Sequence, residues 1–301
     1  TTNGRHNTNE KDHCGRCLRR CRRPLGVTAA VVSNMTRGRS CSCLMAEKAE
    51  TDVFPIDMGI ACEVEHRGEL HPLTERKIRR GTSNFTKAAA MTRQEVLTAI
   101  LTGIDAVRVL KEQGYRLSAV GEMGIGNTTT SSAVASVLLQ KDPELVTGAG
   151  AGLDSAGLKR KTEAIRRGIG LHHPDPMDGM EVLQKVGGFD LAAMAGAFLG
   201  GAIYHVPVVI DGVIAAAAAA AAGRIAPAAT DYMLAAHVSA EPASIWLLDL
   251  IGVTPAIQAG LRLGEGTGAL ALFPLLDMTL SIYRDMDTFA EMEIEEYKPL
   301  V

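Results

Sequence analysis

The stretch GEMGIGNTTTSS, residues 121–132, combines residue types that could bind a phosphate group. The apolar run before it predicts a short buried strand, and SSAVASVLL at its end predicts a helix. Gly124 and Gly126 carry no Cβ, so the backbone can approach a ligand closely. Asn127 and Thr128 precede the helix, whose free N–H groups and positive dipole end favour an anion. The Gly-Lys-Ser/Thr ending of a Walker loop is missing, and an ordinary capped turn remains the alternative.

Two acidic residues stand in glycine-rich turns where a carboxylate could do chemistry. Glu122 lies in the turn just described, and a simple helix cap does not need an acid there. Glu265 lies between Gly264 and Gly266 with apolar stretches on both sides, so it could be partly desolvated and act as a general base. The alternative is that Glu265 only caps the helix that follows it. Its position in the sequence favours neither interpretation.

A second glycine-rich loop, VTGAGAG at residues 146–152, precedes a helix with three consecutive cations. They are Lys159, Arg160 and Lys161, and a solvated helix face is the ordinary interpretation of such a run. A lysine close to two glycine-rich turns could also supply the cation that a phosphate needs. The stretch of residues 148–161 is therefore a possible second half of the phosphate site.

Strands, polar turns and helices alternate along the chain, which predicts an α/β fold with a mostly parallel sheet and helices on both faces. Strands are predicted at residues 52–56, 117–120, 206–210 and 233–237. Thr92 and Glu95 form a capping box that opens a helix to about Gln113, and eight alanines from residue 215 predict a slim helix. Ligands bind at the carboxyl ends of the strands of such sheets. The polar or glycine residues predicted there are Asp57, Glu122, Gly124, Asp211, Gly212 and Ser239.

Composition excludes several classes of protein. The 301 residues are 47% hydrophobic with a net charge of −3, so the chain can bury a large core and no field favours nucleic acid or an acidic membrane surface. No apolar run is long enough to cross a bilayer, and no signal peptide is evident. These features predict a soluble cytoplasmic protein without nucleic-acid or membrane partners.

All six cysteines precede residue 63, and three of them, Cys14, Cys17 and Cys21, are interleaved with arginines. With His13 they could be metal ligands, but the following Cys41 and Cys43 are spaced more tightly than the second half of a zinc site usually is. We therefore predict no metal site and interpret residues 1–26 as an atypical, poorly ordered segment.

Seven motifs, taken together and in order, resemble the nicotinate-nucleotide–dimethylbenzimidazole phosphoribosyltransferase family. They are DVFPIDMGI (52–60), GTSNFTKAAAMTR (81–93), GEMGIGNTTTSS (121–132), VVIDG (208–212), HVSAEP (237–242), LRLGEGTGA (261–269) and TFAEM (288–292). The resemblance implies a doubly wound, Rossmann-like sheet with a smaller helical domain, and a homodimer. The domain would span residues 27–292, its helical part would be built from the chain ends, and residues 293–301 would form an acidic tail.

The resemblance also implies a reaction, in which an aromatic base displaces nicotinate from nicotinate mononucleotide and α-ribazole 5′-phosphate forms, the precursor of the lower ligand of cobalamin. By family match, Glu265 takes the proton from the base. The 5′-phosphate is assigned to Gly124, Gly150 and Lys161. The ribose and nicotinate are assigned to Glu122, Asp211 and Gly212. No metal or organic cofactor is implied.

The chain departs from the family pattern between His13 and Gly26, where it reads CGRCLRRCRRPLG instead of a strand-forming segment. Part of the wall around the incoming base is expected there. The alternative function is therefore a nucleotide-binding homologue with reduced or no turnover, and a metal-binding module built on the cysteines is a further one. The identity of the acceptor base is left open by the sequence.

Overall fold

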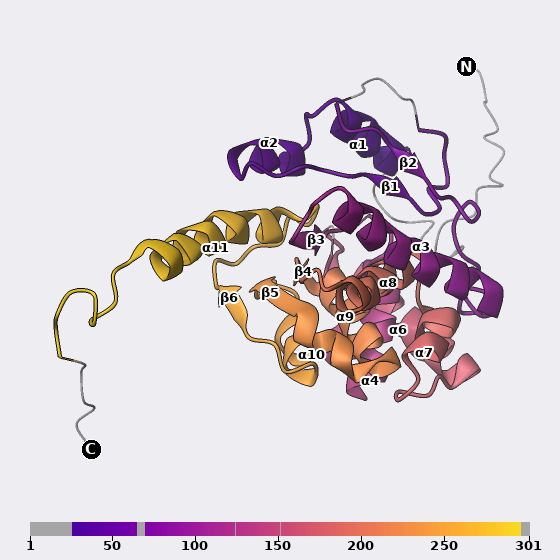
Figure 1. The fold of residues 1–301 in the computed structure, drawn as a ribbon. Coiled ribbons are helices and arrows are strands. Elements are labelled where there is room, and N and C mark those ends of the chain that lie inside the picture. Colours follow the sequence, from indigo (N-terminus) through magenta and orange to yellow (C-terminus); the bar gives the residue numbers. More distant parts are fainter. Residues whose placement is uncertain (1–25, 65–69, 124, 151, 296–301) are drawn as a thin grey trace.

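The computed structural model describes residues 26–64, 70–123, 125–150 and 152–295 (Figure 1). Its main sheet contains β3 (Ser118–Val120), β4 (Val208–Ile210), β5 (Met233–His237) and β6 (Pro255–Ile257), all parallel. The α/β class with a parallel sheet is thus confirmed. The four strands lie in chain order, β3-β4-β5-β6, so the reversal that defines a doubly wound sheet is not present among the described strands.

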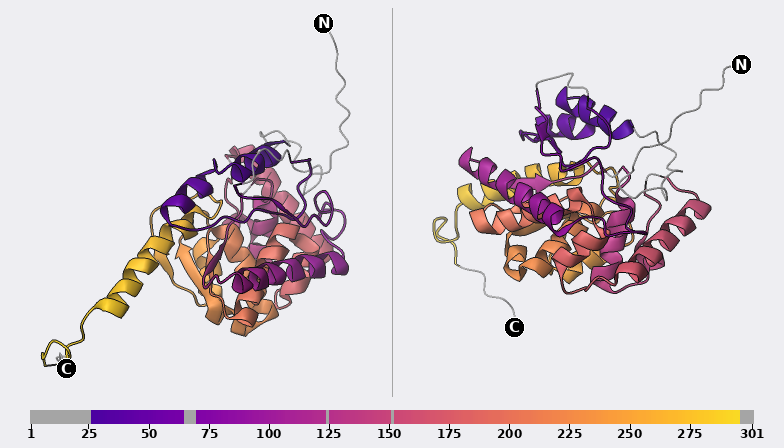
Figure 2. Two further views of the ribbon diagram at one scale, coloured as in Figure 1. Left: turned by 45° about the horizontal axis from the view of Figure 1, so that its top comes forward. Right: turned by 90° about the vertical axis from the view of Figure 1, so that its right-hand side faces the viewer.

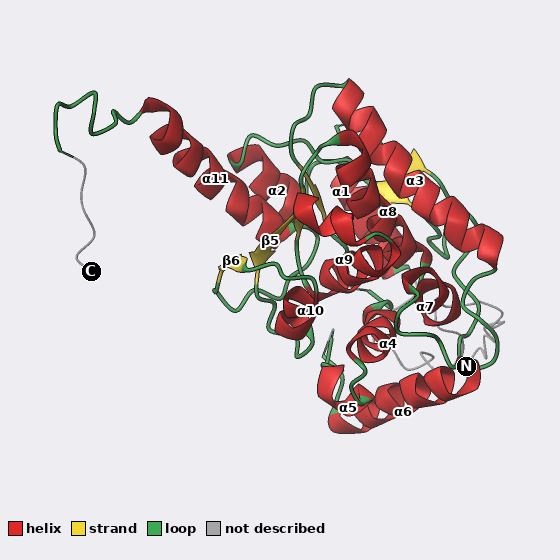
Figure 3. Ribbon diagram, turned by 60° about the horizontal axis from the view of Figure 1, so that its bottom comes forward, coloured by secondary structure: helices red, strands yellow, loops and turns green. Residues whose placement is uncertain are grey.

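Alternate residues of the strands point to opposite faces of the sheet. Val208 and Ile210 pack in the larger core with α8 (Phe189–Tyr204) and α9 (Val213–Ile225). Val209 packs on the other face, in a smaller cluster with α11 (Thr267–Asp285). Helices therefore cover both faces, and Figure 3 shows their arrangement around the strands.

Small residues bring the helices of the larger core close together. The alanine run 215–222 is buried along its whole length in α9. α3 (Arg93–Glu112), which begins at the predicted capping box, packs along α8. A Cβ added at Gly103 of α3 or at Gly196 of α8 would collide with backbone of the opposite helix. This close packing fixes the position of α8.

The amino-terminal elements are not part of the main sheet, although one of them, α2 (Cys41–Lys48), packs against α11 (Figure 2). They also include α1 (Val27–Thr36) and a two-stranded parallel sheet of β1 (Ile56–Asp57) and β2 (Thr74–Glu75). The prediction of a buried strand at residues 52–56 was wrong. Phe54 and Ile56 are 46% and 40% exposed, because they line an open cavity and do not enter the main sheet. Pro55 also has no N–H for a ladder.

The remaining elements are helices. They are α4 (Thr128–Leu139), α5 (Pro143–Val146), α6 (Ser155–His172), α7 (Gly179–Val186), η2 (Pro227–Tyr232) and α10 (Ser244–Leu250). They do not follow the predicted alternation throughout, because α4 to α8 succeed one another without a strand among the described residues between β3 and β4. No helix in the described part of the chain has the length and apolar character to span a bilayer. The division into a large domain, a small helical part and a tail stays a prediction, although α2 does pack against α11.

Candidate active site

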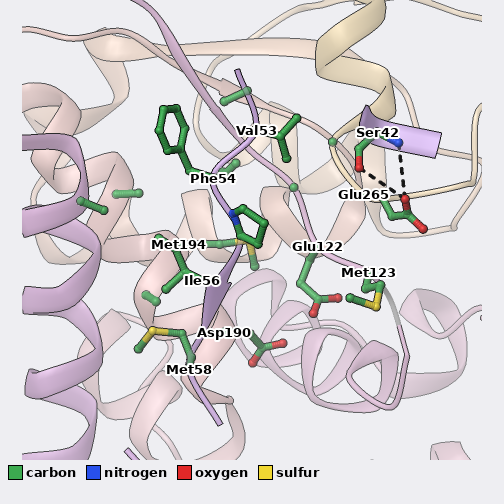
Figure 4. Close-up of a pocket in the computed structure, with 18 of the residues that line it drawn as sticks. Ser42, Val53, Phe54, Ile56, Met58, Glu122, Met123, Asp190, Met194 and Glu265 are labelled. Carbon is green, nitrogen blue, oxygen red and sulfur yellow. Dashed lines mark hydrogen bonds between the residues drawn. The ribbon is translucent and has the colours of Figure 1, made fainter. Parts of the chain in front are cut away.

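A cavity of about 370 Å³ lies between the amino-terminal elements and the carboxyl end of β3. Segment 51–60 and helix α1 line one side, and α3, α8 and the start of α11 line the other. Figure 4 shows that much of the wall is apolar. The labelled apolar residues are Val53, Phe54, Ile56, Met58, Met123 and Met194. A flat aromatic molecule suits such a wall.

All the charged side chains on this wall that the structure describes are acidic. Asp52, Glu122, Asp190 and Glu265 line the cavity, and no Lys, Arg or His is among the described residues that do so. The site therefore carries a negative potential in a mostly apolar setting, where charges are weakly screened. Such a cavity favours a ligand on which positive charge resides or develops.

Glu265 stands at the meeting point of two glycine-rich turns. Its φ of +60° is in the left-handed region, flanked by +84° at Gly264 and +79° at Gly266. A non-glycine residue in this conformation is uncommon and typical of functional turns. The Glu265 N–H donates to the carbonyl of Glu122 at 2.8 Å. Gly121 lies so close to Gly266 that a Cβ there would collide with the Gly266 backbone.

The Glu265 carboxylate is half-buried and lies on the cavity wall. Its Oε2 accepts two long hydrogen bonds of 3.5 Å, from the backbone N–H and the hydroxyl of Ser42. Ser42 belongs to α2, so the amino-terminal part reaches the same carboxylate. Weak hydrogen bonds leave the carboxylate able to accept a stronger one from a ligand.

Asp211, not Glu265, caps α11. Its buried carboxylate accepts hydrogen bonds from the N–H groups of Gly266 (3.1 Å), Gly268 (2.7 Å) and Ala269 (3.2 Å). Burial raises the pKa of Asp211, although nearby His237 and these N–H groups favour the charged form. The alternative interpretation of Glu265 as the cap of this helix is therefore not supported. Asp211 holds the turn that presents Glu265, and whether it also contacts substrate stays a prediction.

The two glycine-rich loops nominated for phosphate lie side by side. Lys161 is only 4% exposed, and its Nζ donates to the carbonyl of Gly148 at 3.0 Å. It is thus not part of the solvated face that Lys159 and Arg160 form. Gly150, at φ +54°, lies against the side chain of Thr128, so a Cβ there would be 2.9 Å from the Thr128 hydroxyl. Gly124 lies outside the described residues.

Asn127 precedes α4 but makes no side-chain cap for it. Its amide Nδ2 donates instead to Asp190 Oδ2 at 2.5 Å. The first N–H groups of α4 are therefore not satisfied by Asn127 and can bind an anion. Gly126, at φ +88°, makes the turn that precedes Asn127.

Asp190 is one of the cavity residues that sequence reasoning missed, with Ser42 and Asp52. It lies in the first turn of α8, and Asp190, Ala193, Met194 and Ala197 all line the cavity. Their spacing of three and four residues is that of one helix face. The signal available was a single acid on an otherwise apolar stripe, in FDLAAMAGAF, but the stripe alone is equally typical of a core helix.

The other predicted site residues do not line the cavity. Gly212 and Ser239 follow β4 and β5 at the carboxyl edge of the main sheet, but Asp57 belongs to β1 of the small sheet, so its predicted place at that edge was wrong. Gly212 precedes α9, and Ser239 is buried two residues after β5, where its N–H donates to the Ser244 hydroxyl. Asp57 is also buried, but it accepts hydrogen bonds from Gly59 and Ile60 at 2.8 Å and pairs with Lys77 at 3.1 Å. These bonds hold segment 51–60 in place against the cavity.

The amino-terminal cysteines Cys14, Cys17 and Cys21 lie outside the described residues, and so does the predicted poorly ordered segment except Gly26. Of the later ones, Cys43 is buried, and its thiol hydrogen-bonds to the carbonyl of Met35 at 3.4 Å. This contact gives Cys43 a packing role.

A family model and several known proteins match most of this chain. The family model described as Phosphoribosyltransferase matches residues 21–294. Relatives from Clostridium acetobutylicum and Ruminiclostridium cellulolyticum are each 44% identical over 277 residues, 92% of this chain and 78% of each relative. Both are named nicotinate-nucleotide–dimethylbenzimidazole phosphoribosyltransferase.

The crystal structure of CobT from Thermus thermophilus superposes with a TM-score of 0.85 at 38% identity, over 91% of this chain and 81% of that one. Fold and sequence thus agree over the same part of the chain. The chain belongs to the nicotinate-nucleotide–dimethylbenzimidazole phosphoribosyltransferase family.

Proposed function

We propose that this protein transfers the phosphoribosyl group of nicotinate mononucleotide to a benzimidazole-type base, giving α-ribazole 5′-phosphate for the lower ligand of cobalamin. The observation that carries the proposal is Glu265, a carboxylate held on the wall of an apolar cavity by a turn of three left-handed residues. Family membership, with relatives named for this reaction, supports it.

In the proposed step, a ring nitrogen of the base attacks the anomeric carbon of the ribose. The bond from that carbon to the nicotinate nitrogen breaks, and its electron pair leaves with nicotinate, which loses its positive ring charge. The other ring nitrogen of the base gives its proton to Glu265, which acts as general base. Attack opposite the leaving group converts a β nucleotide into an α one. Holding both substrates in line supplies much of the rate.

The 5′-phosphate is assigned to the start of α4, to Gly150 and to Lys161. The diverted side chain of Asn127, which leaves the first N–H groups of α4 to a ligand, supports this assignment. Gly124 is part of the same proposed site. Glu122, Gly212 and Ser239 are proposed to border the ribose and nicotinate.

An apolar benzimidazole is the acceptor that the cavity favours. Phe54, Met58 and Met194 line it, and an exocyclic amine such as that of adenine would lose its hydrogen bonds to water against these side chains. Methyl groups on the benzimidazole ring would gain from the same contact. We therefore infer that dimethylbenzimidazole is preferred over adenine.

A single incubation tests the function and the base preference. The purified protein is mixed with nicotinate mononucleotide and, in separate reactions, dimethylbenzimidazole, benzimidazole, adenine or a phenol, and the products are identified by mass. Formation of α-ribazole phosphate with release of nicotinate is the expected result. Thermal stabilisation by the nucleotide without any product would favour the alternative, a binding homologue without turnover.

A homodimer is proposed because of the carboxyl-terminal half of α11. This part of the helix extends away from the main body (Figure 1 and the left view of Figure 2). Its large apolar side chains are exposed, Tyr283 at 86%, Ile282 at 59% and Met278 at 55%, and so is Met286 directly after the helix, at 67%. An apolar surface of this kind is typical of an interface, and a second copy is the proposed occupant. A cytoplasmic location stays a prediction that cell fractionation would test.

A further inference from the structure

We propose that Asp190 is a further catalytic residue, which accepts hydrogen bonds from the ribose hydroxyls and stabilises the positive charge that develops on the ribose as nicotinate leaves. The inference rests on the proposed reaction. It starts from a placement that a core role does not explain, a half-buried carboxylate on the apolar cavity face of α8. The rest of that face, Ala193, Met194 and Ala197, is apolar.

The carboxylate is held in position from two sides. Asn127 Nδ2 donates to its Oδ2 at 2.5 Å. The preceding Phe189 is 1% exposed, and the guanidinium of Arg79 lies over its ring, 5.3 Å from the centroid. Gly188 makes room on the backbone side, since a Cβ there would collide with Asp190 Oδ1. A side chain fixed in this way loses little conformational entropy when a ligand binds.

The position of the phosphate site places the ribose next to Asp190. The 5′-phosphate is joined to the ribose by one methylene group. If the phosphate binds at the start of α4, the ribose lies within a few bonds of Asn127, the residue that precedes this helix. Asp190 is hydrogen-bonded to Asn127 and lines the cavity that contains Glu122 (Figure 4). A single hydrogen bond from Asn127 leaves the Asp190 carboxylate able to accept further hydrogen bonds from hydroxyl groups.

The negative charge of Asp190 has a second proposed role, in the transition state. As the bond to nicotinate breaks, positive charge moves from the nicotinate ring to the anomeric carbon and ring oxygen of the ribose. A carboxylate fixed beside the ribose is attracted to this charge, and no cation among the described lining residues opposes it. Charges preorganised in an apolar site act strongly on a transition state. Asp190 itself is unchanged by the step, while Glu265 takes the proton.

The test uses Asp190→Asn, which keeps the shape but removes the charge, and Asp190→Glu, which keeps the charge. The Asn variant should lose about 10²-fold in kcat, with the dissociation constant of nicotinate mononucleotide, measured by calorimetry, changed only a few-fold. The Glu variant should recover part of kcat. Asp231→Asn, at an exposed aspartate outside the cavity, is the matched control.

Substrates without a hydroxyl separate a direct role from a structural one. In the wild type, 2′-deoxy or 3′-deoxy nicotinate mononucleotide should lower kcat/KM by about 10- to 100-fold, the scale of a hydrogen bond to a charged group. In Asp190→Asn that penalty should largely disappear. A penalty of equal size in both proteins would overturn the inference, as would equal losses in folded Asn and Glu variants. Absence of wild-type turnover would instead contradict the proposed function.

Discussion

At the scale of single residues, Glu265 carries the sharpest prediction. Glu265→Gln keeps the side chain's shape but cannot take the proton, so kcat should fall by about 10²–10⁴-fold. Because Asp211 holds the N–H groups of α11, melting temperature and nucleotide affinity should stay close to wild type. Exposed Glu144→Gln is the control. A folded Gln variant with near-normal turnover would exclude Glu265 as the base.

Lys161 carries the second prediction. Lys161→Ala should weaken binding of nicotinate mononucleotide by about 1.5–3 kcal/mol, the scale of a charged hydrogen bond. Since Lys161 is buried and also donates to Gly148, Lys161→Met retains most of the packing and isolates the charge. Both variants should lose similar affinity in calorimetry, while exposed Lys159→Ala, on the same helix, should lose little. Unchanged affinity in the Met variant would remove Lys161 from the phosphate site.

At the scale of elements, Gly103 of α3 and Gly196 of α8 allow these two helices to pack closely. Gly196→Ala should lower the free energy of unfolding by about 1–3 kcal/mol, because its Cβ would collide with the Ile100 carbonyl. Gly170→Ala in α6 is the matched control, since a Cβ there meets nothing within 4 Å and should stabilise the helix slightly. Chemical denaturation measures both. Equal effects of the two changes would mean that helix propensity, not packing, dominates.

The start of α3 gives a prediction about pH. Burial alone would raise the pKa of Glu95, but hydrogen bonds from Arg79 and Thr92 lower it below its ordinary 4.5. A carboxylate whose pKa is lower in the folded than in the unfolded protein stabilises the fold at pH values above the unfolded pKa. This stabilisation is lost as the pH falls through the folded pKa. The free energy of unfolding should therefore decrease in acid below about pH 4.5.

Glu95→Gln tests this dependence. The variant should lose about 1–2 kcal/mol at pH 7, where the ion pair and capping box are intact. Its difference from the wild type should shrink as the pH is lowered. Urea titrations at several pH values, with exposed Glu47→Gln as control, measure the effect. A difference that is constant with pH would contradict the linkage.

At the scale of the whole molecule, the sequence predicted the elements that depend on neighbouring residues, such as helix starts and alternating strands. The capping box at Thr92, the alanine-rich helix α9 and strand β5 lie where the sequence placed them. The segment around Phe54 is not the buried strand that the sequence predicted, because an apolar run can equally enter a sheet or line a cavity. β6 was missed because it is short and begins with Pro255. Asp190 was missed because its partner, Asn127, is distant in sequence.

Assembly is the last prediction at this scale. If a second copy covers the exposed apolar residues of α11, light scattering should give about twice the chain mass of 31.8 kDa. Ile282→Asp and Tyr283→Asp place a charge on that surface, which is costly to bury unpaired, so both should shift the protein toward the single-chain mass. Asp285→Asn, at an exposed position on the same helix, should not. A wild-type mass of 31.8 kDa at working concentration would contradict the proposed homodimer.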